Sequence, residues 1–313
     1  LAEADESESD KEEDELAEKI LIAVSDNNYA KDLVNLSVTI KSSKNKSDLY
    51  ALSIVDNNNP DDLTEKEAKK VLENAVLTAA ATDNQLTELL RYDTNIVSGI
   101  TNVVKEKKVT DLILGLDKNK GMSDAFIGKL TQGILKRCNK TTLIYKPAQP
   151  LGTIKRHFIV VPHKAEKEIG FPFWLVKMWN IARNTGAKLI FYASEDTLRY
   201  IEKIHQNHPI ECEFNEFSDY EDFLVLSRDI RKDDNLIILM SRPGKPSYQE
   251  NMEKMPKYLN KYFKESSFIL IYPIQIGVDE SVSGMDLKNP SFIEPIEKLD
   301  EIGKTLAKLF KRK

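Results

Sequence analysis

Short apolar runs alternate with helix-patterned stretches along almost the whole chain, and this alternation occurs twice. In the first half the predicted strands are Ile20–Val24, Leu49–Val55, Glu88–Tyr92, Leu112–Leu116 and Thr142–Tyr145. Helical stretches lie between them, and strict alternation of strand and helix is typical of a parallel sheet covered on both faces. The sequence therefore predicts an α/β fold built on doubly wound parallel sheets.

The second half repeats the order of the first. Its predicted strands are Phe158–Val161, Lys188–Tyr192, Ile210–Glu216, Leu236–Met240 and Phe268–Tyr272, with helices near 165–184, 196–207, 219–231 and 249–264. The joint, "KPAQPLGT", holds two prolines and a glycine, which indicates a short and stiff linker. We therefore predict a first domain over 19–147 and a second, degenerate domain over 154–273 that pack against each other.

The two ends of the chain differ in charge from the middle. Residues 1–18 carry ten acidic side chains and one lysine, a net of −9, whereas the whole chain has −5. This composition indicates a solvated acidic tether. The tail, 274–313, ends in a basic amphipathic helix with the apolar stripe Ile296, Leu299, Ile302, Leu306, Leu309 and Phe310. That stripe packs on the protein itself, or docks on a membrane surface or a partner.

Length and composition narrow the class of protein. The 313 residues suit two domains of ordinary size, and no apolar run approaches the roughly 18 residues that cross a bilayer. Cys138 and Cys212 are far apart, which favours reduced, structural thiols in a cytosolic protein. No secretory signal opens the chain, and its start at Leu1 rather than methionine suggests a fragment of something longer.

A glycine-flanked loop follows the fourth predicted strand. In "LILGLDKNKGMSDAFIGKLTQGILKR", Gly115 stands at the end of the strand and Gly128 just before a helix. Ligands of doubly wound sheets bind outside the carboxyl ends of the strands. Free backbone amides and a helix N-terminus attract phosphate there. The loop is therefore a candidate phosphate site, although two flanking glycines alone are weak evidence.

The half-domain order, the opening "KILIAVSD" and the segment "LGLDKNKGMSDAFIGKLTQGILKRCNKTTLIYKP" together resemble the universal stress protein family. In that family a glycine ends the fourth strand, a second follows after two intervening residues, and a third, after nine more, precedes a serine or threonine. These residues bind the ribose and phosphates of ATP in the nucleotide-binding branch. The resemblance covers about 19–147 well and 154–273 by pattern only. It implies a tandem of such domains.

Some of the family's binding positions are matched in this chain and others are not. Gly115 and Gly128 match the first and third glycines, but Lys118 replaces the second glycine and Lys129 replaces the hydroxyl residue. The family's acidic ribose contact falls on Ser25, with Asp26 one place later. A lysine side chain blocks close approach of phosphate to backbone, yet its charge attracts anions. Retained ATP binding, another nucleotide or anion, and a vestigial loop all stay open.

Other candidate chemistry is weaker. In the second half, Arg242 and Lys245 either meet an anion or belong to a solvated basic loop. His205, His208 and Cys212 lack the second ligand pair of a typical metal site, so surface histidines are favoured and no metal is expected. No nucleophile elbow, phosphate-binding Walker loop or paired carboxylates stand out. We therefore expect no enzyme, and we expect no nucleic-acid partner.

An aromatic stretch opens the first helix of the second half. "GFPFWLVKMWNIAR" carries Phe171, Phe173, Trp174, Met178 and Trp179. Aromatic residues and methionine are enriched in protein interfaces, so these five are candidates for contact with the other unit, a second chain or a further domain. Core packing is the alternative.

The degenerate tandem, the charged leader and the missing initiating methionine also resemble the cytosolic tail of some bacterial cation:proton antiporters, Na⁺/H⁺ or K⁺/H⁺ exchangers. This resemblance implies a regulatory domain at the cytoplasmic face of the inner membrane. Its partner is the transport domain of the same polypeptide, and it is a candidate homodimer. It would sense a nucleotide, an ion or a partner. The alternatives are a free-standing tandem universal stress protein that binds a nucleotide, and a dimerisation module without a ligand.

Overall fold

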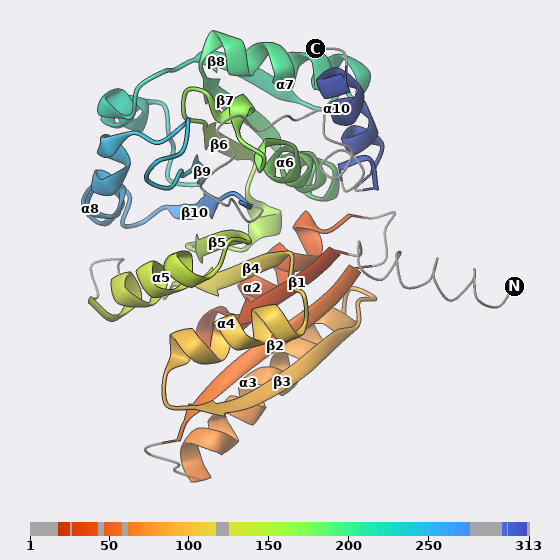
Figure 1. The fold of residues 1–313 in the computed structure, drawn as a ribbon, viewed down its shortest axis with the longest axis vertical. Helices are drawn as coiled ribbons and strands as arrows, with labels where there is room; N and C mark the ends of the chain where they lie inside the picture. The colour runs from red at the N-terminus through yellow and green to blue at the C-terminus, as the bar shows by residue number, and fades with distance from the viewer. Residues whose placement is uncertain are drawn as a thin grey trace, which may run out of the picture.

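The protein is represented by a computed structural model that describes residues 18–25, 27–42, 47–57, 62–116, 125–275, 296–298 and 300–311. One ten-stranded sheet runs through it in the order β3-β2-β1-β4-β5-β10-β9-β6-β7-β8 (Figure 1). Every neighbouring pair is parallel except β5 and β10, which are antiparallel. The sheet therefore consists of two five-stranded units of the same internal order, joined edge to edge.

The first unit holds five strands and four helices. They are β1 (Glu18–Ala23), α2 (Asn27–Ile40), β2 (Ser47–Asp56), α3 (Asp62–Ala80), β3 (Leu86–Asp93), α4 (Ile96–Glu106), β4 (Asp111–Gly115), α5 (Ala125–Arg137) and β5 (Thr141–Lys146). The short 3₁₀ segment η1 (Leu151–Thr153) follows. Parallel strands need long crossovers, and these helices supply them.

The second unit repeats the strands but shortens several helices. It contains β6 (Arg156–Val160), η2 (Ala165–Lys167), α6 (Phe171–Thr185), β7 (Lys188–Ala193), α7 (Glu195–Asn207), β8 (Cys212–Glu216), η3 (Tyr220–Arg228), β9 (Asn235–Leu239), η4 (Glu250–Lys254), α8 (Met255–Tyr262) and β10 (Ser267–Tyr272). The last helix is α10 (Glu301–Lys311). Because β5 and β10 are antiparallel, the carboxyl ends of the two units lie at opposite edges of the sheet.

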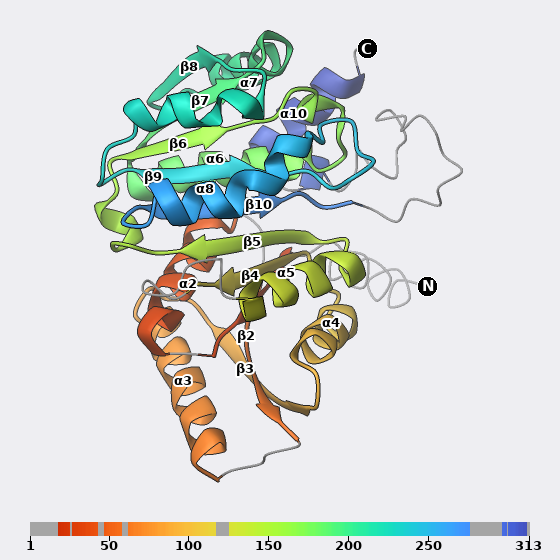
Figure 2. The same cartoon turned by 90° about the vertical axis from the view of Figure 1, so that its left-hand side faces the viewer.

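Two apolar layers cover the sheet, one on each face. Alternate strand residues such as Ile22 and Ile159 pack with α2, α3, α6, α7 and α10. Their neighbours, such as Leu21 and Phe158, pack with α4, α5, η3 and α8. This period-two alternation of two buried faces explains the continuous apolar runs of the strands. Figure 2 shows the helices on either side of the sheet.

The predicted α/β fold class is confirmed, and the main differences concern helices of the second unit. The predicted helix 219–231 is the 3₁₀ segment η3, and the predicted helix 249–264 is η4 followed by α8. Pro256 stands in the first turn of α8, where proline suits a helix start. The stretch 165–184 is divided before α6 at Gly170, where an added Cβ would lie 2.4 Å from the Pro273 side chain. The predicted domain limits themselves stay predictions.

The apolar stripe of the C-terminal helix packs on the protein itself. Ile302, Leu306 and Phe310 of α10 are buried against α6 and α7, and the Phe310 ring stacks on Tyr200 with centroids 6.2 Å apart. This confirms the first alternative for these residues of the stripe and leaves their side chains unavailable to a membrane, while Leu299 lies outside the described residues. Among the described residues, no helix is both long enough and apolar enough to cross a bilayer.

Candidate functional site

The predicted nucleotide edge of the first unit lies where β1 and β4 end. Ser25 follows β1, and its Oγ lies 2.7 Å from the Tyr29 hydroxyl in the first turn of α2. Gly115, the last residue of β4, lies under the same tyrosine, because a Cβ added there would be 2.6 Å from the Tyr29 ring. Tyr29 thus brings Ser25 and Gly115 into one cluster, with its ring over the end of the strand.

This packing explains why position 115 is a glycine without a bound ligand. A side chain at position 115 would meet both the Tyr29 ring and the Leu33 side chain, the latter at 2.9 Å. Glycine therefore lets α2 lie close to the end of β4. The sequence prediction placed Gly115 correctly at the strand end, but its role in packing depends on Tyr29, which no motif marks.

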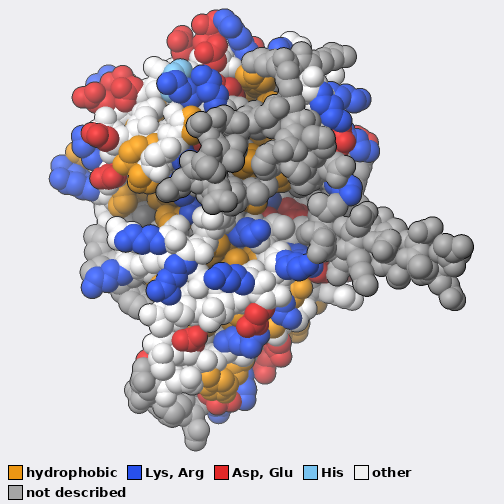
Figure 3. Space-filling model, viewed as in Figure 1, with side chains coloured by type: hydrophobic (Ala, Val, Ile, Leu, Met, Phe, Trp, Pro, Cys, Tyr) orange, Lys and Arg blue, Asp and Glu red, His pale blue; other side chains and the backbone are white. Residues whose placement is uncertain are grey.

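The remaining predicted binding residues are only partly described. Gly128 lies inside α5, which begins at Ala125, so the prediction that it precedes the helix is wrong. Lys129 is exposed on the same helix. Asp26 and Lys118 lie outside the described residues. Figure 3 shows lysines and arginines gathered over the face of α4 and α5. Nucleotide binding stays a prediction.

A buried tyrosine hydroxyl lies on the neighbouring strand. Tyr145 of β5 is in register with Gly115, and its hydroxyl has no hydrogen-bond partner among the described residues. Burial raises the pKa of Tyr145, and the nearby Asp32 carboxylate raises it further. The group is therefore a neutral hydroxyl at physiological pH.

The corresponding edge of the second unit is filled by the chain's own carboxylate. Glu168 is 6% exposed, and its Oε1 accepts hydrogen bonds from the Ser241 hydroxyl at 2.8 Å and the Ser247 amide at 3.2 Å. The Ser247 hydroxyl donates to the same oxygen. Ser241 and Ser247 lie in the loop after β9, which corresponds to the glycine-flanked loop of the first unit. An internal anion thus satisfies the donors of this loop.

A second buried carboxylate lies beside it. Glu166 of η2 accepts a hydrogen bond from the Thr197 hydroxyl at 2.8 Å, and Thr197 lies 3.0 Å from the Ser194 hydroxyl. Both acidic side chains come from the segment between β6 and α6. The second unit therefore lacks the glycine pattern, and the buried side chains of Glu166 and Glu168 fill the space at the carboxyl ends of its strands.

Arg242, a predicted anion contact, instead joins the two units. It is neither solvated nor free, because its guanidinium donates to the carbonyls of Leu135 at 2.7 Å and Cys138 at 2.8 Å, at the end of α5. A cation at a helix C-terminus satisfies free carbonyls and complements the helix dipole. Burial lowers the pKa of Arg242 from its usual high value. Within the described loop the Lys245 side chain makes no comparable contact, and the Lys245 amide donates to the Arg242 carbonyl.

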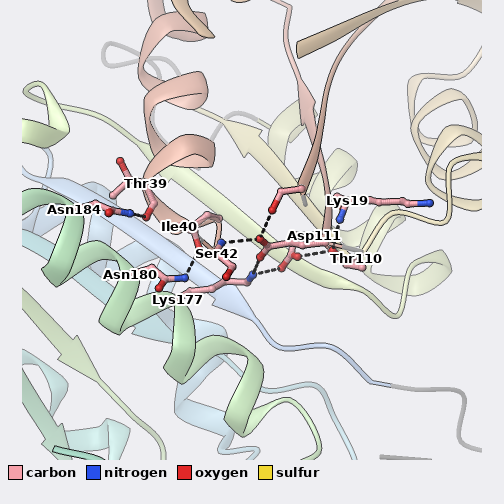
Figure 4. Close-up of polar contacts among 11 residues, drawn as sticks. Lys19, Thr39, Ile40, Ser42, Thr110, Asp111, Lys177, Asn180 and Asn184 are labelled. Atoms are coloured by element: carbon pink, nitrogen blue, oxygen red, sulfur yellow. Dashed lines mark hydrogen bonds and ion pairs between the residues drawn. The ribbon is translucent and has the colours of Figure 1, made fainter. Parts of the chain in front are cut away.

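A buried ionic cluster, formed by Lys177, Glu18 and Asp111, connects the units at the opposite end of the first unit's strands (Figure 4). Lys177 of α6 reaches the first residues of β1 and β4, with its Nζ 2.9 Å from Glu18 and 3.0 Å from Asp111. Glu18 also accepts the Ser42 amide at 2.9 Å and the Ser47 hydroxyl at 3.1 Å. The three charged side chains are all less than one-tenth exposed.

The cluster holds two carboxylates and one ammonium. Asp111 also accepts the Thr110 hydroxyl at 2.7 Å. Burial, reinforced by the Glu18 charge, raises the pKa of Asp111. The two carboxylates outweigh the effect of burial on Lys177 and raise its pKa, so that it stays charged. A group of this composition holds the units together through charge. Each buried charge compensates the others for the water they have lost, so removal of one member leaves the rest uncompensated.

Two asparagines of α6 extend this contact along α2. Asn180 donates to the Ile40 carbonyl at 3.0 Å, and Asn184 donates to the Thr39 carbonyl at 2.8 Å, at the end of α2. The polar side of α6 thus satisfies the last carbonyls of a helix in the other unit. The sequence analysis did not identify Lys177, Asn180 or Asn184 as contacts between the units. The signal that could have found them is Lys177, a lysine in the middle of an otherwise apolar and aromatic helix.

The five aromatic and methionine candidates of α6 are mainly core residues. Phe171, Trp174, Met178 and Trp179 are at most 1% exposed, so of the alternatives left open by the sequence they take core packing and offer no surface to a second chain. Phe171 meets Trp174 edge to face at 5.3 Å, and the Trp179 indole donates to the His208 carbonyl at 2.8 Å. Phe173 is partly exposed and packs at the margin of this core. The aromatic excess reflects a helix covered by the sheet, α2, α7 and α10.

The histidines weighed as metal ligands point to separate partners. His205 Nε2 lies 2.9 Å from the Ile210 carbonyl, and His208 Nε2 lies 2.8 Å from the Thr305 hydroxyl of α10. Cys212 Sγ lies 4.0 Å from the carbonyl of Glu213. These three side chains support the turn after α7 and the docking of α10.

Comparisons with known proteins agree with this fold. Residues 17–146 match the family model described as "Universal stress protein family". Over this stretch the first unit is similar in sequence to that family. No curated protein sequence matches the chain.

Three solved structures illustrate the wider similarity. A universal stress protein from Archaeoglobus fulgidus DSM 4304 has a TM-score of 0.55 at 14% identity, covering 82% of this chain and 98% of that one. The cytoplasmic domain of a prokaryotic cation chloride cotransporter has a TM-score of 0.55 at 12% identity, covering 82% and 95%. A functionally unknown protein from Pseudomonas aeruginosa PAO1 has a TM-score of 0.52 at 12% identity, covering 96% and 99%. At these identities the similarity establishes the fold.

Proposed function

We propose that this chain is a cytosolic regulatory domain of a membrane cation:proton antiporter, an Na⁺/H⁺ or K⁺/H⁺ exchanger, located at the cytoplasmic face of the inner membrane. The observation that carries the proposal is the similarity to a transporter's cytoplasmic domain, which extends over 95% of that domain and includes both units of this sheet. The proposal assigns the chain no catalytic step, no nucleic-acid partner and, as its main partner, the transport domain of the same polypeptide.

The mechanism we propose is a shift between conformations of the transport domain. A regulatory domain can do this only by binding two conformations with different free energies. The ionic cluster supports such coupling, because Glu18, the first residue of β1, is held directly by Lys177 of the other unit. A displacement at the start of β1 would therefore disturb the contact between the units. The effector is a nucleotide, an ion or a partner, and a homodimer is compatible with this role.

Cation:proton exchange in everted membrane vesicles tests the proposal. The complete reading frame that encodes this chain is expressed in an antiporter-deficient bacterial host, and an acridine dye reports the collapse of the pH gradient after Na⁺ or K⁺ is added. Deletion of 18–311 is expected to preserve exchange but to shift the cation concentration or pH that gives half-maximal activity. Absence of exchange from the intact frame would overturn the antiporter assignment, and identical curves would overturn regulation.

A point variant refines this experiment. Lys177→Met breaks the ionic cluster and is expected to shift the exchange curve in the direction of the deletion. Lys257→Met is the matched control, because Lys257 is exposed on α8. If both variants leave the curve unchanged while the deletion shifts it, the cluster is not the coupling element.

The alternative is a free-standing universal stress protein that binds a nucleotide. The observation that favours it is the match of residues 17–146 to that family. A thermal-shift titration with ATP and AMP is expected, on this alternative, to raise the melting temperature saturably, and Lys129→Ala should weaken the effect. No shift with either nucleotide would remove it.

A further inference from the structure

The outer half of the second unit has an open recess on its sheet. In the first unit, α4 covers the corresponding face and buries Ile100, Val103 and Val104 against it. In the second unit the crossover between β8 and β9 is the 3₁₀ segment η3, whose buried residues Phe223 and Leu226 pack into the layer that includes α8. With this 3₁₀ segment in place of an α-helix, a hollow of about 510 Å³ remains over β6, β7 and β8.

The floor of this recess is built from residues in register on one face of the sheet. Phe158, Ile190 and Glu213 are neighbours across β6, β7 and β8, and Tyr192 and Asn215 form the next row. The rings of Phe158 and Tyr192 stack with centroids 5.7 Å apart and are 2% and 9% exposed. Little apolar surface therefore reaches solvent, and the recess offers mainly polar groups to a ligand.

The rim is held in place by charged side chains that neutralise one another. Arg156 donates to both oxygens of Asp234, from Nε at 2.9 Å and from Nη2 at 2.6 Å. Asp234 also accepts the Arg231 amide at 2.6 Å, which fixes the backbone of the rim. Lys188 pairs with Glu213, and the Tyr192 hydroxyl lies 3.5 Å from Asp229. The site is thus formed before any ligand arrives.

Two guanidinium groups of the rim take no part in these ion pairs. Arg228 and Arg231 both line the recess, both are exposed, and neither forms an ion pair with another described residue. The guanidinium group recognises phosphate and carboxylate through parallel hydrogen bonds. A volume of this size suits a small metabolite rather than a macromolecule.

We infer that this recess binds a small, hydroxyl-bearing anion, a sugar phosphate or similar molecule, through Arg228 and Arg231. Asn215 and Asp229 supply the neutral and acidic groups that hydrogen-bond to hydroxyls, and Tyr192 forms the floor. The recess lies on the face of the sheet, away from the strand ends where the glycine-flanked loop of the first unit is located. The inference does not depend on the proposed transport function.

Isothermal titration of the complete chain tests this inference, with ribose 5-phosphate as the probe and ribose as its uncharged counterpart. Saturable one-to-one binding is expected for ribose 5-phosphate and none for ribose. The double variant Arg228→Gln, Arg231→Gln is expected to weaken binding at least tenfold, because it removes two charge-assisted contacts. Lys232→Gln, an exposed neighbour outside the recess, should change the affinity less than twofold.

Side-chain signals of arginine place the probe. In a ¹⁵N spectrum the Nε–Hε signals of Arg228 and Arg231 are expected to shift on titration, while that of Arg183, exposed on α6, stays unchanged. Three results would overturn the inference: no saturable binding, equal binding of ribose, or binding that survives the double variant. Binding that is lost in Lys129→Ala instead would place the ligand at the first unit's loop.

Discussion

The amino-terminal ends of the central strands differ between the two units although their register is the same. In the first unit Ile20 is opposite Asp111, and the acidic side chain is paired with a lysine from the other unit. In the second unit His157 is opposite Asn235, and the two form a neutral hydrogen bond of 3.0 Å. The amino-terminal edge of the first unit thus forms a charged contact with the second unit. The same edge of the second unit is uncharged and makes its contact within that unit.

The carboxyl ends differ in the opposite way. In the first unit, Tyr29 and Leu33 of α2 pack over the end of β4, and the Tyr29 hydroxyl lies 2.7 Å from Ser25 Oγ. In the second unit Glu168 satisfies the loop after β9. The comparison shows that two units with the same strand order fill this edge differently, one with a tyrosine and the other with an internal carboxylate. It also predicts where each unit is sensitive to mutation.

The largest expected effect is the loss of Lys177. Lys177→Met leaves two buried carboxylates without their cation, which should cost about 3–5 kcal/mol of the free energy of unfolding. The measurement is urea denaturation at pH 7, with Lys257→Met as a control that should stay within about 0.5 kcal/mol. A loss below about 1 kcal/mol would contradict the view that the cluster holds the units together.

The same variant has a pH dependence with a definite sign. Without Lys177, the pKa of Asp111 should rise further above its unfolded value, so that the native state binds more protons than the unfolded state. Stability then increases as the pH falls toward the unfolded pKa, and it is lost as the pH rises through the native pKa. The deficit of Lys177→Met should therefore shrink between pH 7 and pH 5, and a constant deficit would speak against buried charge as its cause.

The second expected effect concerns His157. Burial lowers the pKa of His157 to about 4 from 6.5, so the native state binds fewer protons than the unfolded state between these values. Stability should fall by about 3 kcal/mol as the pH drops from 6.5 to 4. In His157→Gln this part of the pH dependence should disappear, whereas His205→Gln should retain it. Equal pH profiles of the native chain and His157→Gln would show that burial does not lower the pKa of His157.

The third effect lies at the carboxyl end of the second unit. Glu168→Gln keeps the shape of the side chain but removes the charge that accepts hydrogen bonds from Ser241 and Ser247. Because hydrogen bonds to charged groups are the stronger kind, we expect a loss of about 2 kcal/mol in the free energy of unfolding. Glu195→Gln, on the exposed first turn of α7, is the comparison variant. An equal effect of both variants would mean that Glu168 does not satisfy the loop.

The order of strands and the fold class were predictable from the sequence, because apolar runs such as Leu236–Met240 and their spacing are local signals. The joining of two units through antiparallel β5 and β10 was not, since pairing between edge strands leaves no local pattern. The role of Lys177 depends on residues 66 and 159 positions away. Gly115 was found by its position, but its contact with Tyr29 depends on the angle at which α2 crosses the sheet.

The smallest expected effect tests the role of this glycine. Gly115→Ala places a Cβ 2.6 Å from the Tyr29 ring, so the ring must move. We expect a loss of about 1 kcal/mol, at the low end for overpacking, because the ring lies at the partly open edge of the sheet. In a Tyr29→Leu background the same substitution should cost much less, since the ring is gone. A double-mutant cycle by urea denaturation measures this coupling. If the cost of Gly115→Ala is the same in both backgrounds, close packing against Tyr29 is not what glycine provides at the end of β4, and a ligand at this edge becomes the better explanation.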